Sequence, residues 1–103
     1  MKVKQYSLEI SEEAEKDFDN SYEYYFNDSP EIADAFFQRI NISLEIIRRS
    51  PLAFQKIHKS LRRVIVKKFP FVIYYQVVGH TIRIIAIFHT SRNPKVWTAR
   101  SKD

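Results

Sequence analysis

Much of the first half of the chain has an apolar residue at every third or fourth position, which is the period of an amphipathic helix. Ala14, Phe18, Tyr22 and Tyr25 share one face of such a helix. Ser11 precedes them as a favourable N-cap, and the glutamates that follow it suit the positive end of the helix dipole. The pattern predicts a first helix that begins just after Ser11.

A second helical pattern follows a break at residues 27–30. Ser29 is a good N-cap, and Pro30 fits the first helical position. Arg48 and Arg49 lie at the other end, where the dipole favours cations. Because the connection is short, we expect the two helices to form an antiparallel hairpin. The predicted apolar stripe of the second helix is Ile32, Phe36, Ile40, Leu44 or Ser43, and Ile47.

Runs rich in Val, Ile, Phe and Tyr, which are typical of strands, make up much of the remaining chain. They span residues 61–68, 71–77 and 81–88, and residues 5–10 alternate in the manner of an earlier strand. Gly79, the only glycine, falls in a tight turn where a hairpin needs a positive φ. The last run is apolar at both odd and even positions, which indicates a central strand and not an edge.

The predicted element order is β-α-α-β-β-β, an α+β fold in which an antiparallel sheet packs against an antiparallel helical hairpin. Residues 55–60 are expected to form a basic connector between the second helix and the sheet. The chain has 103 residues and shows no linker, repeat or low-complexity stretch. It therefore fits a single domain, residues 1–103, with one modest core.

Composition excludes several kinds of site. Without cysteine, the chain forms neither disulfides nor zinc–thiolate centres. A single glycine cannot build a phosphate-binding loop, and no histidine pair has ligand spacing, so neither cofactor nor metal is expected. The apolar runs are too short for a bilayer and no signal segment is recognised, which predicts a cytoplasmic protein without membrane contacts.

Charge divides the chain into an acidic and a basic part. Residues 1–45 hold eleven of the twelve acidic residues but only four of the seventeen Lys and Arg. We therefore expect one acidic and one basic face, the latter suited to RNA, DNA or an acidic protein. The alternative is that the basic side chains only solvate the surface.

His89 is the histidine best placed for a function, because it follows the last predicted strand and a strand end positions side chains rigidly. Alternation places it on the same face as Arg83, Ile85 and Ile87. The other two histidines lie in the connector and in the hairpin turn, where solvent is expected to surround them. The structural alternative is that His89 is hydrogen-bonded to a neighbouring loop.

One metal-independent reaction suits these residues, namely cleavage of RNA through attack of its 2′-hydroxyl. The reaction needs a base, cations on the phosphoryl oxygens and an acid. A neutral His89 is a suitable base near neutral pH. The other candidates are Arg62 or Arg63, Lys56 and Arg92 as cations, with Tyr74 or Trp97 to stack a nucleobase.

The segment that follows His89 also has a structural interpretation. Asn93 is a good N-cap and Pro94 a good first residue for a short terminal helix or turn. Trp97 would then anchor that segment over the sheet, a role that its large apolar area favours over base stacking.

Several segments, in order, resemble the RelE/ParE superfamily of bacterial toxins from type II toxin–antitoxin systems, over about residues 5–97. They are SEEAEKD at the start of the first helix, the paired helices, LRRVIVKK, FPFVIYYQV, and IRIIAIFHTSRNPKVW. The last two look most like the ParE side, where the segment after the final strand commonly reads H-x-x-R-x-P-x-x-W.

The resemblance implies a toxin neutralised by a cognate antitoxin, whose acidic segment wraps around the toxin. ParE-type members act on DNA gyrase without cleaving nucleic acid, whereas RelE-type members are ribosome-dependent mRNA interferases. The C-terminal tyrosine of several RelE-type enzymes is missing here, and Trp97 in its neighbourhood cannot transfer a proton. The RelE-like positions in this chain are Lys56 or Lys59, Arg62 or Arg63, His89 and Arg92.

Three functions follow from these observations. The first is a ParE-like toxin that binds a protein target such as gyrase, the second is an mRNA interferase, and the third is a non-toxic antitoxin-binding module. The residues expected to bind target or antitoxin are Lys59, Lys67, Lys68, Tyr74, Arg83, Lys95 and Trp97.

Overall fold

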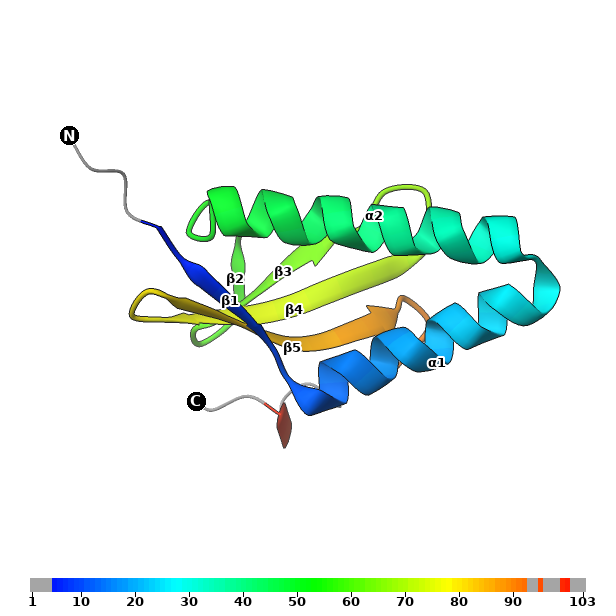
Figure 1. The fold of residues 1–103 in the computed structure, drawn as a ribbon. Helices are drawn as coiled ribbons and strands as arrows, with labels where there is room; N and C mark the ends of the chain where they lie inside the picture. The colour runs from blue at the N-terminus through cyan, green and yellow to red at the C-terminus, as the bar shows by residue number, and fades with distance from the viewer. Residues whose placement is uncertain (1–4, 93–94, 96–98, 101–103) are drawn as a thin grey trace.

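The computed structural model describes residues 5–92, 95 and 99–100 of the chain (Figure 1). A short strand comes first, two long helices follow it, and the remaining strands complete the described part. The elements are β1 (Ser7–Ile10), α1 (Glu12–Asp28), α2 (Pro30–Arg49), β2 (Lys56–His58), β3 (Leu61–Ile65), β4 (Phe71–Val78) and β5 (Thr81–His89).

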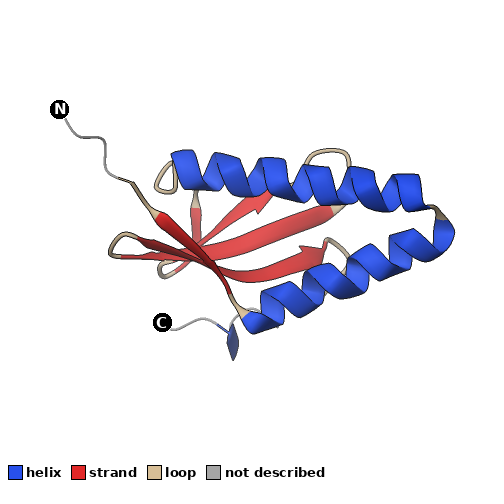
Figure 2. Cartoon of the chain, viewed as in Figure 1, coloured by secondary structure: helices blue, strands red, loops and turns tan. Residues whose placement is uncertain are grey.

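The strands form a five-stranded sheet with the order β1-β5-β4-β3-β2. The pair β1–β5 is parallel, and the other neighbouring strands are antiparallel. The α1–α2 hairpin covers one face of this sheet, which we call the helical face (Figure 2). The predicted α+β fold is confirmed, and β5 lies between β1 and β4, as its two apolar faces predicted.

Two features of the sheet differ from the expected order. The connector at residues 55–60 contains β2, a three-residue strand that pairs with the start of β3. Such a short strand carries no recognisable alternation. The sheet is also mixed, because β1 pairs parallel to β5 along Ser7–Ile10.

Both helices begin at the predicted caps. The Ser11 hydroxyl accepts from the Ala14 N–H at 3.1 Å, and the Ser29 hydroxyl accepts from the Ile32 N–H at 3.4 Å. The buried stripe of α2, however, is rotated slightly from the expected one, since Ile32 is 39% exposed. Its buried members are Ala33, Phe36, Ile40, Ser43 and Ile47.

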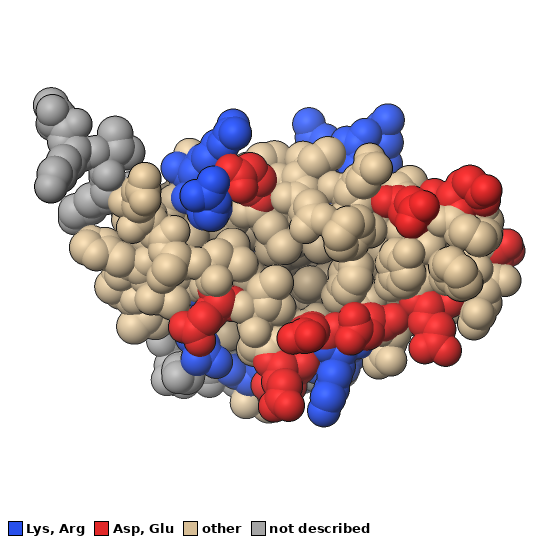
Figure 3. All heavy atoms as spheres, in the orientation of Figure 1, with Lys and Arg blue, Asp and Glu red and all other residues tan. Residues whose placement is uncertain are grey.

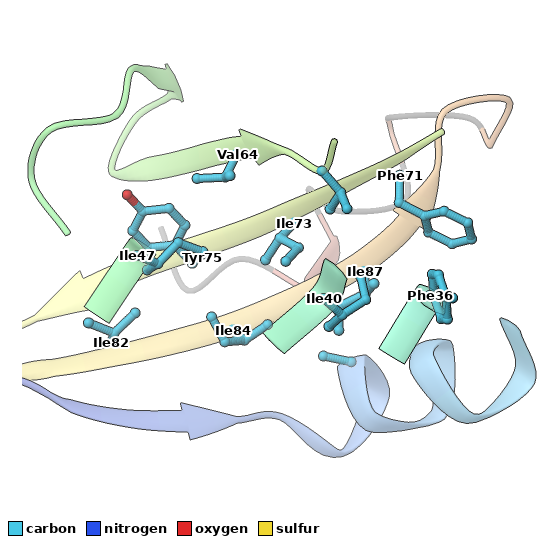
Figure 4. Packing of buried hydrophobic residues seen from close by; sticks show 12 residues of the cluster. Phe36, Ile40, Ile47, Val64, Phe71, Ile73, Tyr75, Ile82, Ile84 and Ile87 are labelled. Atoms are coloured by element: carbon cyan, nitrogen blue, oxygen red, sulfur yellow. The ribbon is translucent and has the colours of Figure 1, made fainter. Parts of the chain in front are cut away.

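The main core lies between the helical hairpin and the helical face of the sheet. Figure 4 shows side chains of α2 facing the sheet, with Phe36 beside Phe71, Ile40 beside Ile87 and Ile47 beside Tyr75. Each buried side chain of this size contributes roughly 1.5–3 kcal/mol relative to an exposed one. A second buried cluster on the opposite face comprises Leu61, Val72, Tyr74, Ile85, Ala86 and Phe88.

A bulge in β5 changes the direction of the last side chains of that strand. Tyr74 pairs with Ala86 whereas Tyr75 pairs with Ile84, so Ile85 is an extra residue on β5. His89 therefore lies on the face of Ile84 and not on that of Ile85. The expected grouping of His89 with Arg83 and Ile85 is wrong, because simple alternation does not pass through a bulge.

Candidate functional site

His89 ends β5 opposite Phe71, the first residue of β4. The two rings meet edge to face, with centroids 5.3 Å apart and an interplanar angle of 78°. The backbone N–H of Ser91 donates to Nδ1 of His89 at 3.0 Å, and the Ser91 hydroxyl lies 2.7 Å from the same atom. Nδ1 therefore acts as an acceptor, and in the neutral ring the proton is on Nε2. This is the contact that the structural interpretation of His89 predicts.

A shallow cleft surrounds the His89 ring. It holds about 360 Å³ between α1 and the ends of β4 and β5. Tyr24 and Tyr25 form its aromatic side, and Asn20 and Ser21 contribute polar groups. No cationic side chain lines this cleft among the described residues, so a phosphate there would have no charged partner.

Asp17 gathers four hydrogen bonds at the end of β5 while being only 8% exposed. Its Oδ2 accepts from the Ile87 N–H at 3.1 Å and from Arg100 Nη1 at 2.7 Å. Its Oδ1 accepts from Arg100 Nη2 at 3.2 Å and from Arg92 Nη1 at 3.3 Å. Both guanidinium groups lie over the Phe88 ring, at 4.1 Å for Arg92 and 4.9 Å for Arg100. Arg92 is thus held by an ion pair to Asp17 of α1 while its guanidinium group stacks on Phe88, which belongs to the buried cluster on the face of the sheet away from the helices.

The sequence interpretation missed Asp17, although a signal was present. Asp17 lies three residues after Ala14, on the face of α1 that is otherwise apolar. A carboxylate at such a position needs a buried partner, because an isolated buried charge is strongly unfavourable. The partners, Arg92 and Arg100, come from the far end of the chain.

Arg62 also has a structural role. Its Nη1 donates to the carbonyl oxygens of Phe54 at 2.6 Å and Leu52 at 3.3 Å, which ties β3 to the loop after α2. It lies opposite Tyr75, whose hydroxyl donates to the Pro51 carbonyl at 2.7 Å. Burial raises the pKa of Tyr75 to about 12, although the positive charge of Arg62 acts to lower it.

The remaining predicted site residues differ in their exposure to solvent. Tyr74 is 6% exposed and packs on Phe88, so its ring is not at the surface for a partner or a nucleobase. Arg83 is partly buried. Trp97 lies outside the described residues, as do Asn93 and Pro94. The exposed candidates are Lys56, Lys59, Arg63, Lys67, Lys68 and Lys95.

The candidate ribonuclease residues do not converge within the described part of the chain. Arg62 pairs with Tyr75, and His89 pairs with Phe71, four residues away on β4. Four strand residues span roughly 13 Å. Arg92 contacts Phe88 on one face, whereas His89 packs on Phe71 at the other.

Acidic side chains are concentrated on the helices, whereas basic side chains lie on the sheet and also on α2. Figure 3 shows acidic side chains along α1 and around the tip of the hairpin. The exposed basic residues named above lie on β2, β3 and the loops of the sheet. No group of three potential metal ligands occurs among the described residues. Neither described helix is long and apolar enough to cross a membrane.

Comparisons with known proteins support one family. The profile described as "ParE toxin of type II toxin-antitoxin system, parDE" matches residues 8–94. A solved structure described as "Chromosomal ParDE TA system from P. aeruginosa" has the same fold, with a TM-score of 0.74 and 22% identity. The alignment covers 84% of this chain and 98% of that one. No curated protein gives a significant sequence match. Because the profile spans most of the sequence, the chain belongs to the ParE toxin family of type II toxin–antitoxin systems.

Proposed function

We propose that this ParE-family toxin stops growth by binding a protein target, with DNA gyrase as the expected one, and that a cognate antitoxin neutralises it. The observation that carries this proposal is the dispersal of the candidate ribonuclease residues. His89 lies opposite the first residue of β4, Arg62 lies opposite Tyr75 near the middle of that strand, and Arg92 contacts Phe88 on the other face of the sheet.

Cleavage of RNA needs a base and cations within hydrogen-bond reach of one phosphate. The roughly 13 Å between the positions of His89 and Arg62 is several times that reach. Arg62 and Arg92 also already bind carbonyl oxygens and Asp17, respectively. Recruiting them for catalysis would break the contact of β3 with the loop after α2 and the contact of Arg92 with α1.

Binding a protein target has structural requirements that differ from those of RNA cleavage. It needs exposed side chains over a wide area but no single point of convergence. We propose that exposed cations on the sheet and its loops, together with Arg83, contribute to target or antitoxin binding. They are Lys59, Lys67, Lys68, Arg83 and Lys95.

The test is to express the chain without its antitoxin in bacteria and to follow growth, the DNA-damage response and mRNA integrity. We expect growth arrest, an induced damage response and intact mRNA, and inhibition of purified gyrase in a supercoiling assay. The His89→Ala variant should arrest growth as the unaltered chain does. Cleavage of ribosome-bound mRNA that His89→Ala abolishes would contradict the proposal and establish an mRNA interferase. Absence of growth arrest would leave the non-toxic binding module.

A further inference from the structure

The last turns of α1 carry two adjacent tyrosines whose rings form a corner. Tyr24 and Tyr25 meet edge to face, with ring centroids 5.6 Å apart and an interplanar angle of 70°. Tyr25 also packs on Phe69 and Phe71, which hold its ring against the end of the sheet. Tyr24, by contrast, is 72% exposed. We call this pair the tyrosine corner, and it presents an exposed aromatic ring on a rigid support.

Two hollows adjoin at the tyrosine corner. One is the cleft beside His89, and the other holds about 460 Å³ and is lined by Tyr24, Tyr25, Asn27 and Asp28. Because both hollows include the two tyrosines, they form one recess along the end of α1. Residues three and four positions apart share a helix face, which places the Asp28 carboxylate beside both rings.

The carboxylate of Asp28 gives this recess a negative charge. Asp28 forms no ion pair with another described residue, and no described Lys or Arg lines either hollow. Asp28 also ends α1, where the helix dipole adds partial negative charge, and the last turn of α1 has no basic residue. Further acidic side chains surround the tip of the hairpin (Figure 3). The recess therefore attracts a cation.

Among the cations of proteins, a guanidinium group suits the recess best. The face of a tyrosine ring attracts cations through its quadrupole. A guanidinium group is planar and stacks on such a ring, and it can donate two parallel hydrogen bonds to one carboxylate. A phosphate or an acidic segment would be repelled by Asp28. The antitoxin segment, which we expect to be acidic, is therefore a poor occupant.

We propose that the recess at the tyrosine corner binds an arginine side chain of the protein target, stacked on Tyr24 and paired with Asp28. The target would thus contact a different part of the surface from the one that suits an acidic antitoxin. That the arginine belongs to the target rests on the proposed function, whereas the chemistry of the bound group rests on the recess.

The first test is an NMR titration of the purified chain with a blocked pentapeptide that has one arginine between glycines. The ring resonances of Tyr24 and Tyr25 should shift and saturate at roughly millimolar peptide. Binding should be at least about fivefold weaker in Tyr24→Ala and in Asp28→Asn. The matched controls are Phe26→Ala and Asp19→Asn, which change exposed residues of the same helix and should bind as the unaltered chain does.

Peptides with lysine or glutamate in place of the arginine test the assigned chemistry. The lysine peptide should bind more weakly, and the glutamate peptide should cause no saturating shift. The proposal is overturned if the arginine peptide causes no saturating shift, or if the lysine peptide binds as tightly. Equal losses in Asp28→Asn and Asp19→Asn would also overturn it.

The second test measures inhibition of purified gyrase in a supercoiling assay. Tyr24→Ala and Asp28→Lys should inhibit at least about tenfold less than the unaltered chain, whereas Phe26→Ala and Asp19→Lys should inhibit equally well. Circular dichroism establishes that each variant is folded. Calorimetry should give the same affinity for the purified cognate antitoxin in every case. Weaker antitoxin binding with unchanged inhibition of gyrase would overturn the choice of occupant.

The peptide titration keeps this inference separate from the proposed function. If the unaltered chain does not inhibit gyrase, the proposed target is wrong, yet the titration still decides whether the recess binds a guanidinium group. If the chain inhibits gyrase but the arginine peptide does not bind, the proposed function stands and the inference about the recess is overturned.

Discussion

Asp17 is a single residue on which the end of the sheet depends. Replacing Asp17 with alanine removes the carboxylate that accepts the hydrogen bond of the Ile87 N–H. It also breaks the bidentate contact with Arg100, whose side chain is 15% exposed. Loss of one partner from a buried pair costs about 3–5 kcal/mol. We expect Asp17→Ala to lower the free energy of unfolding by about 3 kcal/mol, measured by urea denaturation. Asp19→Ala, on the exposed side of α1, should change it by less than about 0.5 kcal/mol. Equal effects of the two substitutions would contradict the role of Asp17.

The partners of Asp17 could not be predicted from the sequence. The helical period placed Asp17 on an apolar face, but its partners Arg92 and Arg100 are 75 and 83 positions away. Nothing local to either end of the chain indicates this pairing. For His89, the position at the end of a strand was predictable from the sequence, but the face of the sheet on which its side chain lies was not. That direction depends on a bulge, which is set by pairing with β4.

At the scale of elements, the hydroxyl of Tyr75 joins β4 to the loop after α2 through the Pro51 carbonyl. Burial raises the pKa of Tyr75 in the folded protein to about 12, against about 10 for an exposed tyrosine. The contribution of Tyr75 to the free energy of unfolding is therefore complete below pH 10 and is lost as the pH rises toward 12. Across that interval the loss is about 2–3 kcal/mol relative to a residue that does not titrate.

Tyr75→Phe should reveal this contribution. At pH 8 we expect the variant to be less stable than the unaltered chain by about 1 kcal/mol, because the Pro51 carbonyl loses its donor. Between pH 10 and 12 the difference should shrink and then reverse, as followed by denaturant unfolding. Tyr24→Phe is the control, since Tyr24 is 72% exposed. Parallel pH curves for the unaltered chain and Tyr75→Phe would contradict the prediction.

The elements themselves were largely predictable, because their signals are local. Ser11 and Ser29 cap the helices as expected, and Gly79 has the positive φ, +60°, that its turn needs. Strand β2 was missed because three residues give no period. The exact stripe of α2 was ambiguous because Ile32 and Ala33 are both apolar, and only packing against α1 and the sheet decides which is buried.

At the scale of the whole molecule, acidic residues are concentrated on the helical hairpin (Figure 3). Basic residues lie on the sheet and its loops, and Arg39, Arg48 and Arg49 lie on α2. The acidic character of the hairpin was predictable from the division of the sequence at about residue 45, but Arg48 and Arg49, which follow that division, lie on α2. A groove between α2 and β3, lined by Ile46 and Ile65, was not predictable, since it joins side chains from two layers that only the fold brings together.

The separation of charge predicts how the complex with the antitoxin should form. An acidic antitoxin segment approaching the basic residues is steered by charges that salt screens over about 10 Å at 0.1 M. We expect the association rate to fall roughly tenfold between 50 and 500 mM salt, with a much smaller change in the dissociation rate. Stopped-flow or biolayer measurements at several ionic strengths give both rates. In Arg39→Glu combined with Lys67→Glu, the salt dependence should be weaker, because two of the steering charges are reversed. An association rate that does not vary with ionic strength would mean that antitoxin capture depends on apolar contacts alone and that the basic layer serves another partner.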